Sequence, residues 1–231
     1  KYSKIPLKSW LPNNFKLTDK FLKNFSNIDG LKKIQSENIG ILLKNAYAKT
    51  NQPKKYADAM ETLKNYNTFK NKYEKMGFKI DLDHPLNKMF LKGSGSTGKD
   101  LLYVTPLDRN YNRGVKAQVG KKYTQALLGY TKKDGTKIPA NLKRAKEIKL
   151  LSNELGMNIG SVKGQKIDKG TTIFNLDKDF KKEFLANERE RNLVQKKLKT
   201  KEGKNILKNI NLKKITQDLG TLGCPKGLPA A

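Results

Sequence analysis

Residues 80–119 read IDLDHPLNKMFLKGSGSTGKDLLYVTPLDRNYNRGVKAQV, and the elements they predict set the fold of the chain. Apolar and polar residues alternate in FKIDLDH, residues 78–84, as they do in a half-buried strand. DLLYVTP, residues 100–106, predicts a second short strand that ends at its proline, because proline lacks a backbone N–H. Asp108 is a good N-cap for a helix that continues to about Gly129. The stretch therefore predicts a strand, a loop, a strand and a helix.

The loop between the two strands contains GSGSTGKD, residues 93–100, which matches the phosphate-binding pattern G-x-x-x-x-G-K. Asp100 stands where that pattern requires a Ser or Thr hydroxyl to ligate Mg²⁺. A phosphate loop must also open into a helix, whereas the segment after this loop predicts a strand. Both the residue and its context argue against a nucleotide-binding loop.

His84 is the only histidine of the chain, and Asp83 precedes it directly. An Asp-His-Pro run at the end of a strand is most often a turn, and a lone histidine is more often structural than catalytic. The elements that follow change this interpretation. They are a loop, a second strand, and a helix that opens with Asn-Arg-Gly at 112–114 and has Lys116 close behind.

This order of residues and elements resembles the ββα-metal core of the HNH, or His-Me finger, endonucleases over residues 78–120. It is especially similar to the HNH domain of the RNA-guided CRISPR nucleases, where a basic helix with Asn-Arg-Gly-Lys follows an Asp-His pair. The resemblance implies that His84 is the general base that activates water, for which an unperturbed pKa of about 6.5 is suitable. It also implies that Asp83 and Asn112 bind one divalent metal ion. Mg²⁺ or Mn²⁺ is expected, because both prefer such hard oxygen ligands.

Three basic residues of the same helix, Arg109, Arg113 and Lys116, would then contact the phosphates that flank the cleaved bond. Asn110 is an alternative metal ligand, and Asn112 is preferred because Arg-Gly follows it.

The chain departs from the family pattern in three places. Pro85 follows the histidine at once, where the family usually has an apolar residue. Asp100-Leu101 replaces the Asn-Leu pair that orders the loop beside the base in many members, so Asp100 is the candidate for that role. The cysteine pairs that bind a structural zinc in many members are absent, because Cys224 is the only cysteine.

Helices are expected on both sides of this core. The helix before the core runs from Pro53 to Met76 and carries an apolar stripe, which is interpreted as core rather than as a base-stacking surface: Tyr56, Met60, Leu63, Phe69 and Tyr73. After a turn at Asp134-Gly135, helices are expected over 139–155, 177–199 and 202–219. The apolar face of the helix over 177–199 is predicted to be Phe180, Phe184, Leu193, Val194 and Leu198. That of the last is predicted to be Ile206, Leu207, Ile210, Leu212, Ile215 and Leu219.

The acidic residues of these downstream helices are interpreted as solvated ion-pair partners of neighbouring lysines: Glu183, Glu188, Glu190 and Glu202. The predicted fold class is mainly α with a small central β-hairpin, an α+β chain in which helices flank a ββα-metal-like core. Three regions are expected: a helical N-terminal region (1–77), the HNH-like core (78–130) and a basic helical C-terminal extension (131–231).

The charge of the chain points to nucleic acid, with double-stranded DNA as the expected partner. Lys and Arg total 49 against 21 Asp and Glu, which gives a net charge of +28, and phosphate backbones attract such a surface. Part of this excess reflects a general bias toward Lys, since only five basic residues are Arg. No apolar run is long enough to span a membrane, and no helix combines a basic face with exposed Trp and Phe, so no membrane partner is expected.

The rest of the chain bears on its origin. A single cysteine forbids an internal disulfide and fits an intracellular setting, either the host cytoplasm or the interior of a virion. ELGMNIGSV at 154–162 and LGTLGCPKG at 219–227 are similar to parts of long, uncharacterised marine phage proteins. Together with a start at Lys1, this likeness implies a piece of a larger phage polypeptide.

Two functions follow from the sequence. The first is a metal-dependent HNH-like endonuclease that hydrolyses or nicks DNA. The alternative is a non-catalytic nucleic-acid-binding or virion-internal phage protein that keeps a degenerate HNH-like scaffold.

Overall fold

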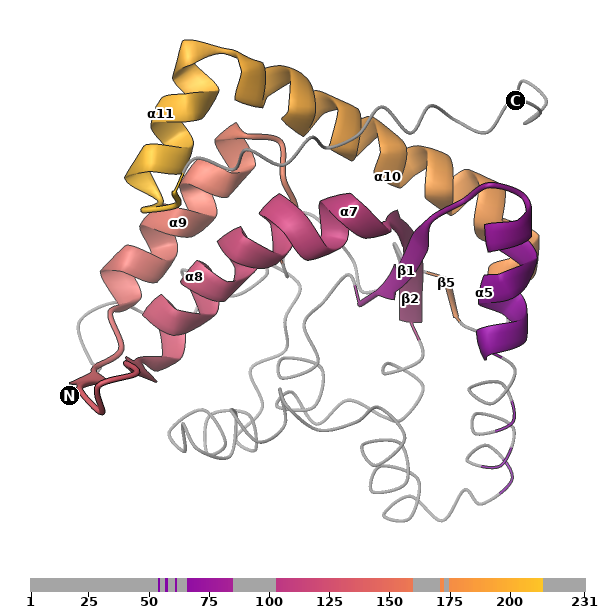
Figure 1. The fold of residues 1–231 in the computed structure, drawn as a ribbon, viewed down its shortest axis with the longest axis horizontal. Coiled ribbons are helices and arrows are strands. Elements are labelled where there is room, and N and C mark those ends of the chain that lie inside the picture. Colours follow the sequence, from indigo (N-terminus) through magenta and orange to yellow (C-terminus); the bar gives the residue numbers. More distant parts are fainter. Residues whose placement is uncertain are drawn as a thin grey trace.

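A computed structural model describes residues 66–84, 103–159, 171–172 and 175–213, and the single positions Lys54, Ala57 and Glu61. In this part of the chain the helical segments are α5 (Tyr66–Lys75), α7 (Arg109–Tyr111), the π-helical η3 (Asn112–Lys116), α8 (Ala117–Leu128), α9 (Leu142–Glu154), α10 (Leu176–Lys199) and α11 (Lys201–Asn209). The strands are β1 (Ile80–Asp83), β2 (Tyr103–Asp108), β3 (Tyr130–Thr131), β4 (Lys137–Ile138) and β5 (Thr171–Thr172). The mainly helical α+β fold class is confirmed (Figure 1).

β2 is the central strand of a small antiparallel sheet with the order β1-β2-β5. Its register with β1 runs from the Ile80–Asp108 pair to the Asp83–Thr105 pair, whereas β5 pairs only with the first two residues of β2. β3 and β4 form a separate hairpin. The sequence predicted one two-stranded element, so β5 and this hairpin are additional. Each of the three added strands has 2 residues, too few for an alternating pattern to be recognised.

Pro106 lies inside β2, opposite Leu82, and the prediction that it ends the strand is wrong. The Pro106 carbonyl accepts a hydrogen bond from Asn187 Nδ2 of α10 at 2.7 Å. The backbone N and O of one strand residue point to the same side, so those of Pro106 face α10 and not β1. The missing N–H therefore removes no hydrogen bond from the β1–β2 ladder.

Side chains from α5, from β1 and the residues just before it, and from α10 form a buried cluster that is mostly aromatic. Tyr73, Phe78, Ile80, Phe180 and Phe184 are its buried members, and Phe69 packs against them. The Tyr73 ring stacks on Phe180 with 3.5 Å between ring centroids. The prediction that Tyr73 and Phe69 belong to the core is confirmed, whereas Tyr56, Met60 and Leu63 of the same stripe lie outside the residues whose side chains are described.

This cluster joins segments that are far apart in the sequence. Tyr73 precedes the expected boundary at residues 77 and 78, and Phe180 and Phe184 follow the one at residues 130 and 131. α10 packs along β2, and α9 packs against both α8 and α11. The described parts of the three expected regions therefore share contacts, and Figure 1 shows α10 running from the α5–sheet end to the α8–α9–α11 layer.

α10 buries part of the predicted apolar face, with one error. Phe180, Phe184 and Val194 are buried, whereas Leu193 is 56% exposed. Successive helix residues are about 100° apart, so Leu193 lies about 140° away from Phe180 around the helix, and Arg191 lies only about 20° away. The buried position that the leucine was expected to fill is occupied by the charged Arg191.

α11 ends at Asn209, ten residues before the predicted end at 219. Asn211 adopts a left-handed conformation with φ 62°, which an asparagine tolerates better than most residues, and the Leu212 N–H donates to the Leu207 carbonyl at 3.1 Å. Ile206, Leu207 and Ile210 are buried as predicted. Leu212 lies outside the helix, and Ile215 and Leu219 lie outside the described residues.

The predicted bounds of the helical segment after β2 are confirmed. Asp108 Oδ1 accepts the Tyr111 N–H at 2.8 Å and caps the segment that ends at Gly129, where φ is 69°. α9 was expected to begin at Pro139, but it begins three residues later at Leu142, where the Asn141 side chain caps it by accepting the Arg144 N–H at 2.9 Å. No helix in the described segments has the length and apolar character that crossing a membrane requires.

Candidate functional site

The candidate site lies where β1 faces the helical segment that follows β2. Asp81 and Asp83 are two residues apart on β1, so their side chains point to the same face of the sheet. The Asp108 cap starts α7 directly at the end of β2, and the Arg109 N–H donates to the Lys79 carbonyl at 2.8 Å. These contacts place α7 and η3 beside β1, so the helical segment that follows β2 lies next to the strand that precedes it.

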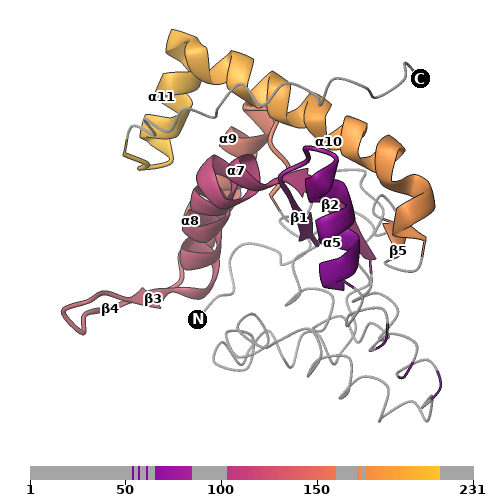
Figure 2. The same cartoon turned by 45° about the vertical axis from the view of Figure 1, so that its right-hand side comes forward.

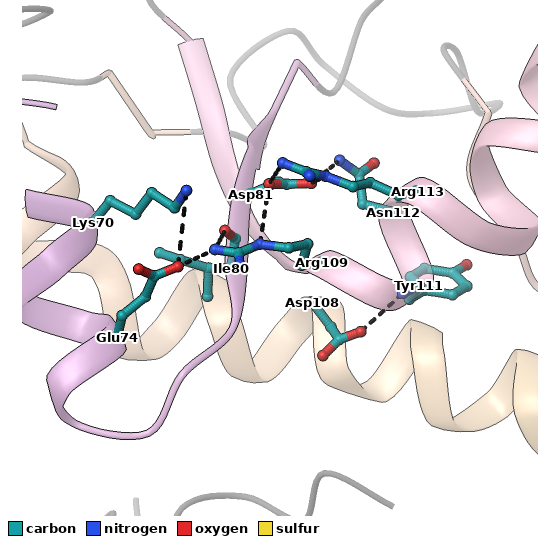
Figure 3. Close-up of polar contacts among 9 residues, drawn as sticks. All are labelled: Lys70, Glu74, Ile80, Asp81, Asp108, Arg109, Tyr111, Asn112 and Arg113. Atoms are coloured by element: carbon teal, nitrogen blue, oxygen red, sulfur yellow. Dashed lines mark hydrogen bonds and ion pairs between the residues drawn. The ribbon is translucent and has the colours of Figure 1, made fainter. Parts of the chain in front are cut away.

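Asp81 is the carboxylate that organises this face (Figure 3). Arg113 donates to both of its oxygens, from Nε and Nη2, each at 2.7 Å. Asn112 Nδ2 donates to Oδ2 at 3.3 Å, and Arg109 Nε lies 3.6 Å from Oδ1. Because Asp81 is only 9% exposed, Arg113 and Asn112 provide the hydrogen bonds that water cannot.

Arg109 extends this network to α5. Its guanidinium is ion-paired with Glu74 and donates to the Ile80 carbonyl at 3.3 Å, and Lys70 lies 3.8 Å from the same Glu74 carboxylate. The chain of alternating charges thus runs from α5 across β1 to η3 (Figure 3). Asp81 and Glu74 were missed in the sequence. The available signal for Asp81 was its spacing of two residues from Asp83, which places both on one face of a strand.

Asp83 contacts a different cation. Lys116 Nζ lies 3.3 Å from Asp83 Oδ2 and 3.7 Å from Glu190 Oε1, and its side chain is only 13% exposed. The ammonium also lies 5.9 Å from the centre of the Tyr111 ring. One lysine therefore connects β1 to α10 through two carboxylates.

Glu190 is not the solvated surface residue that the sequence predicted. It accepts hydrogen bonds from the Tyr111 hydroxyl at 2.7 Å and from the Asn158 N–H at 3.2 Å. Burial, and then the negative charges of Glu190 and Asp83, raise the pKa of Tyr111 well above its usual range. Tyr111 therefore acts as a neutral hydrogen-bond donor at physiological pH.

A second buried cluster connects α10 to Asp108, the residue that caps α7. Arg191 lies 2.5 Å from Glu188 and 3.4 Å from Asp108, and the side chains of all three are at most 8% exposed. Glu188 was predicted to be solvated, and it is buried. Burial raises the pKa of Glu188 to about 7, repulsion by Asp108 adds to this effect, and the Arg191 charge opposes it.

The other two acids of that prediction differ from each other. Glu183 is half-buried, and burial is the main cause that raises its pKa. Glu202 is a solvated partner as predicted, because its side chain is 67% exposed and lies 3.0 Å from Lys197.

His84 is the first residue after β1, and it is half-buried. It is therefore adjacent in the chain to Asp83, at the end of the strand that carries both carboxylates of the site. Asp100, the candidate loop-ordering residue, and the glycine-rich loop at 93–100 lie outside the described residues.

The expected metal ligands lie on facing elements, Asp83 on β1 and Asn112 on η3, and each has a protein partner. The Asn112 amide nitrogen donates to Asp81, and Asp83 is paired with Lys116. Asn110, the alternative ligand, is exposed on α7. Within the described ranges, no cluster of three or more His, Cys, Asp or Glu side chains is arranged to hold a metal ion.

The donor chemistry of this pair nevertheless suits a hard divalent ion. Asp83 supplies a carboxylate and Asn112 an amide carbonyl, both oxygen donors of the type that Mg²⁺ and Mn²⁺ prefer. An ion bound to Asp83 would compete with the Lys116 ammonium for the same carboxylate.

The helix changes its geometry at the asparagine that was singled out. Residues Asn112–Lys116 form a π-helical segment, and the backbone leaves helical φ/ψ values at Gly114. Such single π-helical turns are frequent at functional sites. Here the irregular turn carries the side chains of Asn112, Arg113 and Lys116, which contact the two aspartates of β1.

Comparison of this chain with protein-family models, with curated proteins and with solved structures found no match.

Proposed function

We propose that this protein is a metal-dependent endonuclease of the HNH type, which hydrolyses phosphodiester bonds in DNA. The observation that carries the proposal is the contact between β1 and the π-helical turn. Asp81 meets Asn112 and Arg113, Asp83 meets Lys116, and His84 follows directly. The residue types of the proposed reaction are thus gathered on two adjacent elements.

In this proposal His84 removes a proton from the attacking water, a role that requires the neutral imidazole present near pH 7. Asp83 and Asn112 would hold the Mg²⁺ or Mn²⁺ ion. When bound, the ion would stabilise negative charge on the scissile phosphate and on the leaving oxygen. Asp81 positions Asn112, because it accepts the amide hydrogen bond that fixes the side chain.

The three basic residues are suited to different tasks. The Arg113 side chain is 65% exposed, so it can contact a phosphate from solvent while it remains near Asp81. Arg109 and Lys116 are 26% and 13% exposed, and both are held by carboxylates. We therefore propose Arg113 as the principal phosphate contact, and Arg109 and Lys116 as residues that contribute positive charge and position the acids.

A second candidate function is favoured by one specific contact. The Lys116 ammonium neutralises Asp83 at 3.3 Å, at the carboxylate that the metal ion would require. A protein that had lost catalysis would retain such an ion pair to stabilise the fold. The alternative is thus a nucleic-acid-binding protein, in a phage virion or in the host cytoplasm, with an HNH-like scaffold and no cleavage.

Nicking of supercoiled plasmid DNA in Mg²⁺ or Mn²⁺ tests the proposal. We expect the wild type to convert supercoiled to open-circular DNA, and His84→Ala to reduce the rate by about 10²- to 10⁴-fold, the usual contribution of a general base. Asn112→Ala should also lose activity. Asn110→Ala tests the alternative ligand on the same helical segment; if Asn112 is the ligand, this variant should stay within about three-fold of wild type, because the Asn110 side chain is exposed on α7.

Binding measured in EDTA separates the two functions. If His84→Ala and Asn112→Ala bind DNA like the wild type, their loss of nicking reflects chemistry. If the wild type binds DNA and nicks it with neither metal, the nuclease is excluded and the binding protein is supported.

A further inference from the structure

The β3–β4 hairpin extends away from the rest of the described structure. Figure 2 shows it leaving the end of α8 and pointing away from the helices. Tyr130 and Ile138, which pair at its base, are half-buried, whereas every residue from 131 to 137 is exposed. The hairpin is therefore anchored at one end and open to solvent at the other.

Several contacts fix the direction of this hairpin. At Gly129, where φ is 69°, a Cβ atom would lie 2.5 Å from the Ile138 carbonyl oxygen, so only glycine allows the two chains to cross so closely. The Asn141 N–H donates to the Ala126 carbonyl at 2.7 Å, which joins the exit of the hairpin to the last turn of α8. These contacts hold the hairpin at a defined angle to α8.

The tip is also ordered by its own turn. Asp134 Oδ1 accepts the Thr136 N–H at 2.9 Å, and this hydrogen bond lowers the pKa of Asp134. The Lys132 N–H donates to the Thr136 carbonyl at 2.8 Å, and Gly135 supplies the left-handed turn with φ 83°. The single acidic residue of the tip is thus engaged with the backbone.

The tip presents three lysines and no apolar side chain. Lys132, Lys133 and Lys137 are exposed, and none of them forms a salt bridge with another described residue. The remaining tip residues are Thr131, Asp134, Gly135 and Thr136. A tip that inserted into a membrane would need aromatic or aliphatic residues, so the composition favours a polyanion in water over a lipid surface.

The position of the hairpin relative to the candidate site suits an extended polyanion. α8 has 12 residues and separates the π-helical turn from the hairpin, which corresponds to about 18 Å at the usual helical rise. This length equals about five base-pair steps of B-form DNA. Lys121 on α8 is exposed between the two positions. A duplex lying at Arg113 would reach the hairpin if it followed α8.

We propose that the β3–β4 hairpin is a nucleic-acid-binding arm, in which Lys132, Lys133 and Lys137 contact the phosphate backbone of a duplex that extends from the candidate site along α8. This inference rests on the nucleic-acid partner of the proposed function and does not require cleavage. Because lysines contact phosphates without reading bases, the arm increases affinity for any sequence.

The test is the salt dependence of duplex binding, measured by fluorescence anisotropy with a labelled DNA duplex of about 30 base pairs in EDTA, long enough to span the site and the arm. The arm variant carries Lys132→Gln, Lys133→Gln and Lys137→Gln. The matched control carries Lys196→Gln, Lys199→Gln and Lys201→Gln, which removes the same charge from the α10–α11 corner. Figures 1 and 2 both show this corner at a distance from the hairpin.

We expect the slope of log Kobs against log salt to become less steep by about 2 to 3 in the arm variant, because each lost phosphate contact removes about 0.9. Its affinity at about 0.1 M NaCl should fall at least about ten-fold, whereas the control should change by less than about three-fold. Circular dichroism should show the same secondary structure for all three proteins, because the substituted side chains lie outside the core.

Equal losses in the two variants would overturn the proposal, because they would show a general charge effect. An arm variant with the wild-type slope, or a wild type that binds no duplex, would also overturn it. The binding assay is carried out in EDTA, so its result does not depend on cleavage. A protein that binds DNA through the arm but does not cleave it would disprove only the proposed nuclease.

Discussion

Among the individual residues, Glu188 is the group whose environment differs most from that expected for a helix rich in lysine. Its carboxylate lies against Arg191 and Asp108 inside the protein, and burial raises its pKa from the ordinary value of 4.5 to about 7. The folded protein therefore keeps a proton on Glu188 at pH values where the unfolded chain has released it. A higher pKa in the folded state means that stability decreases as the pH rises from about 4.5 to about 7.

We expect the free energy of unfolding to fall by up to about 3 kcal/mol between about pH 5 and pH 8, since each pKa unit corresponds to about 1.4 kcal/mol. In Glu188→Gln the side chain is neutral at every pH, so this variant should show a flatter dependence. Urea titrations followed by far-UV circular dichroism across this pH range measure both. Because other groups titrate equally in the two proteins, parallel curves would show that Glu188 does not keep its proton in the folded state.

The two aspartates of β1 could be interpreted from the sequence only in part. Asp83 was singled out by the histidine that follows it, whereas Asp81 had no motif, although it has more partners in the structure. Arg113 lies 32 positions from Asp81 in the sequence. No local rule identifies such a partner, because the pairing depends on the β1–β2 register and on the angle of the following helix.

Among the elements, the α10–α11 corner depends on the absence of a side chain at Gly203. Thr200 caps α11 by accepting the Gly203 N–H at 3.0 Å, and its hydroxyl donates to the Lys197 carbonyl at 2.7 Å. A Cβ atom at Gly203 would lie 2.0 Å from the Lys197 carbonyl oxygen and 2.6 Å from its carbon. Backbone atoms, unlike flexible side chains, can move away only if the corner opens.

We expect Gly203→Ala to destabilise the protein by about 1 to 3 kcal/mol, the usual cost of overpacking a buried position. Gly120→Ala is the matched control, because Gly120 lies within α8 and a Cβ atom added there would meet no described atom within 4 Å beyond its own stretch of helix. That change should stabilise by about 0.5 to 1 kcal/mol through the lower entropy of the unfolded chain. Urea unfolding of the two variants gives both values. If Gly203→Ala were as stable as Gly120→Ala, the close approach at the corner would be disproved.

Element boundaries were predicted well where a local signal existed. Asp108, Gly129 and Gly156 begin or end segments where the sequence predicted, because capping groups and left-handed glycines act over only a few residues. The end of α11 was missed because the apolar pattern continues beyond Asn209 while the backbone turns at Asn211. The π-helical turn at Asn112–Lys116 has no sequence signature of this kind.

Across the molecule as a whole, the positive charge opposes compaction. The net charge of +28 over 231 residues is brought together when the chain folds, and the folded state therefore carries more self-repulsion than the expanded one. The ion pairs of the candidate site offset this repulsion only locally. Dissolved salt at 0.1 M screens exposed charges that lie more than about 10 Å apart, so it weakens the repulsion between lysines spread over the surface.

We expect the free energy of unfolding to rise by on the order of 1 kcal/mol between about 20 mM and 300 mM salt, because screening relieves repulsion in the folded state. Chemical denaturation with urea, which carries no charge, measures this change. Sodium and potassium chloride should give the same curve, since the effect is one of ionic strength. A decrease in stability with salt would mean that the favourable ion pairs outweigh the repulsion.

Amino-acid sequence was sufficient to predict the order of the elements around the candidate site: β1, β2, the Asp108 cap and the helical segment that follows. These features are local, so nearby residues are enough to encode them. Only the tertiary structure shows which charges form pairs. Arg113 contacts Asp81, Lys116 contacts both Asp83 and Glu190, and Arg191 contacts Asp108. Burial and the pairing of charges that are distant in the sequence depend on how α10 packs on the sheet. The spacing of residues along the chain does not determine that packing.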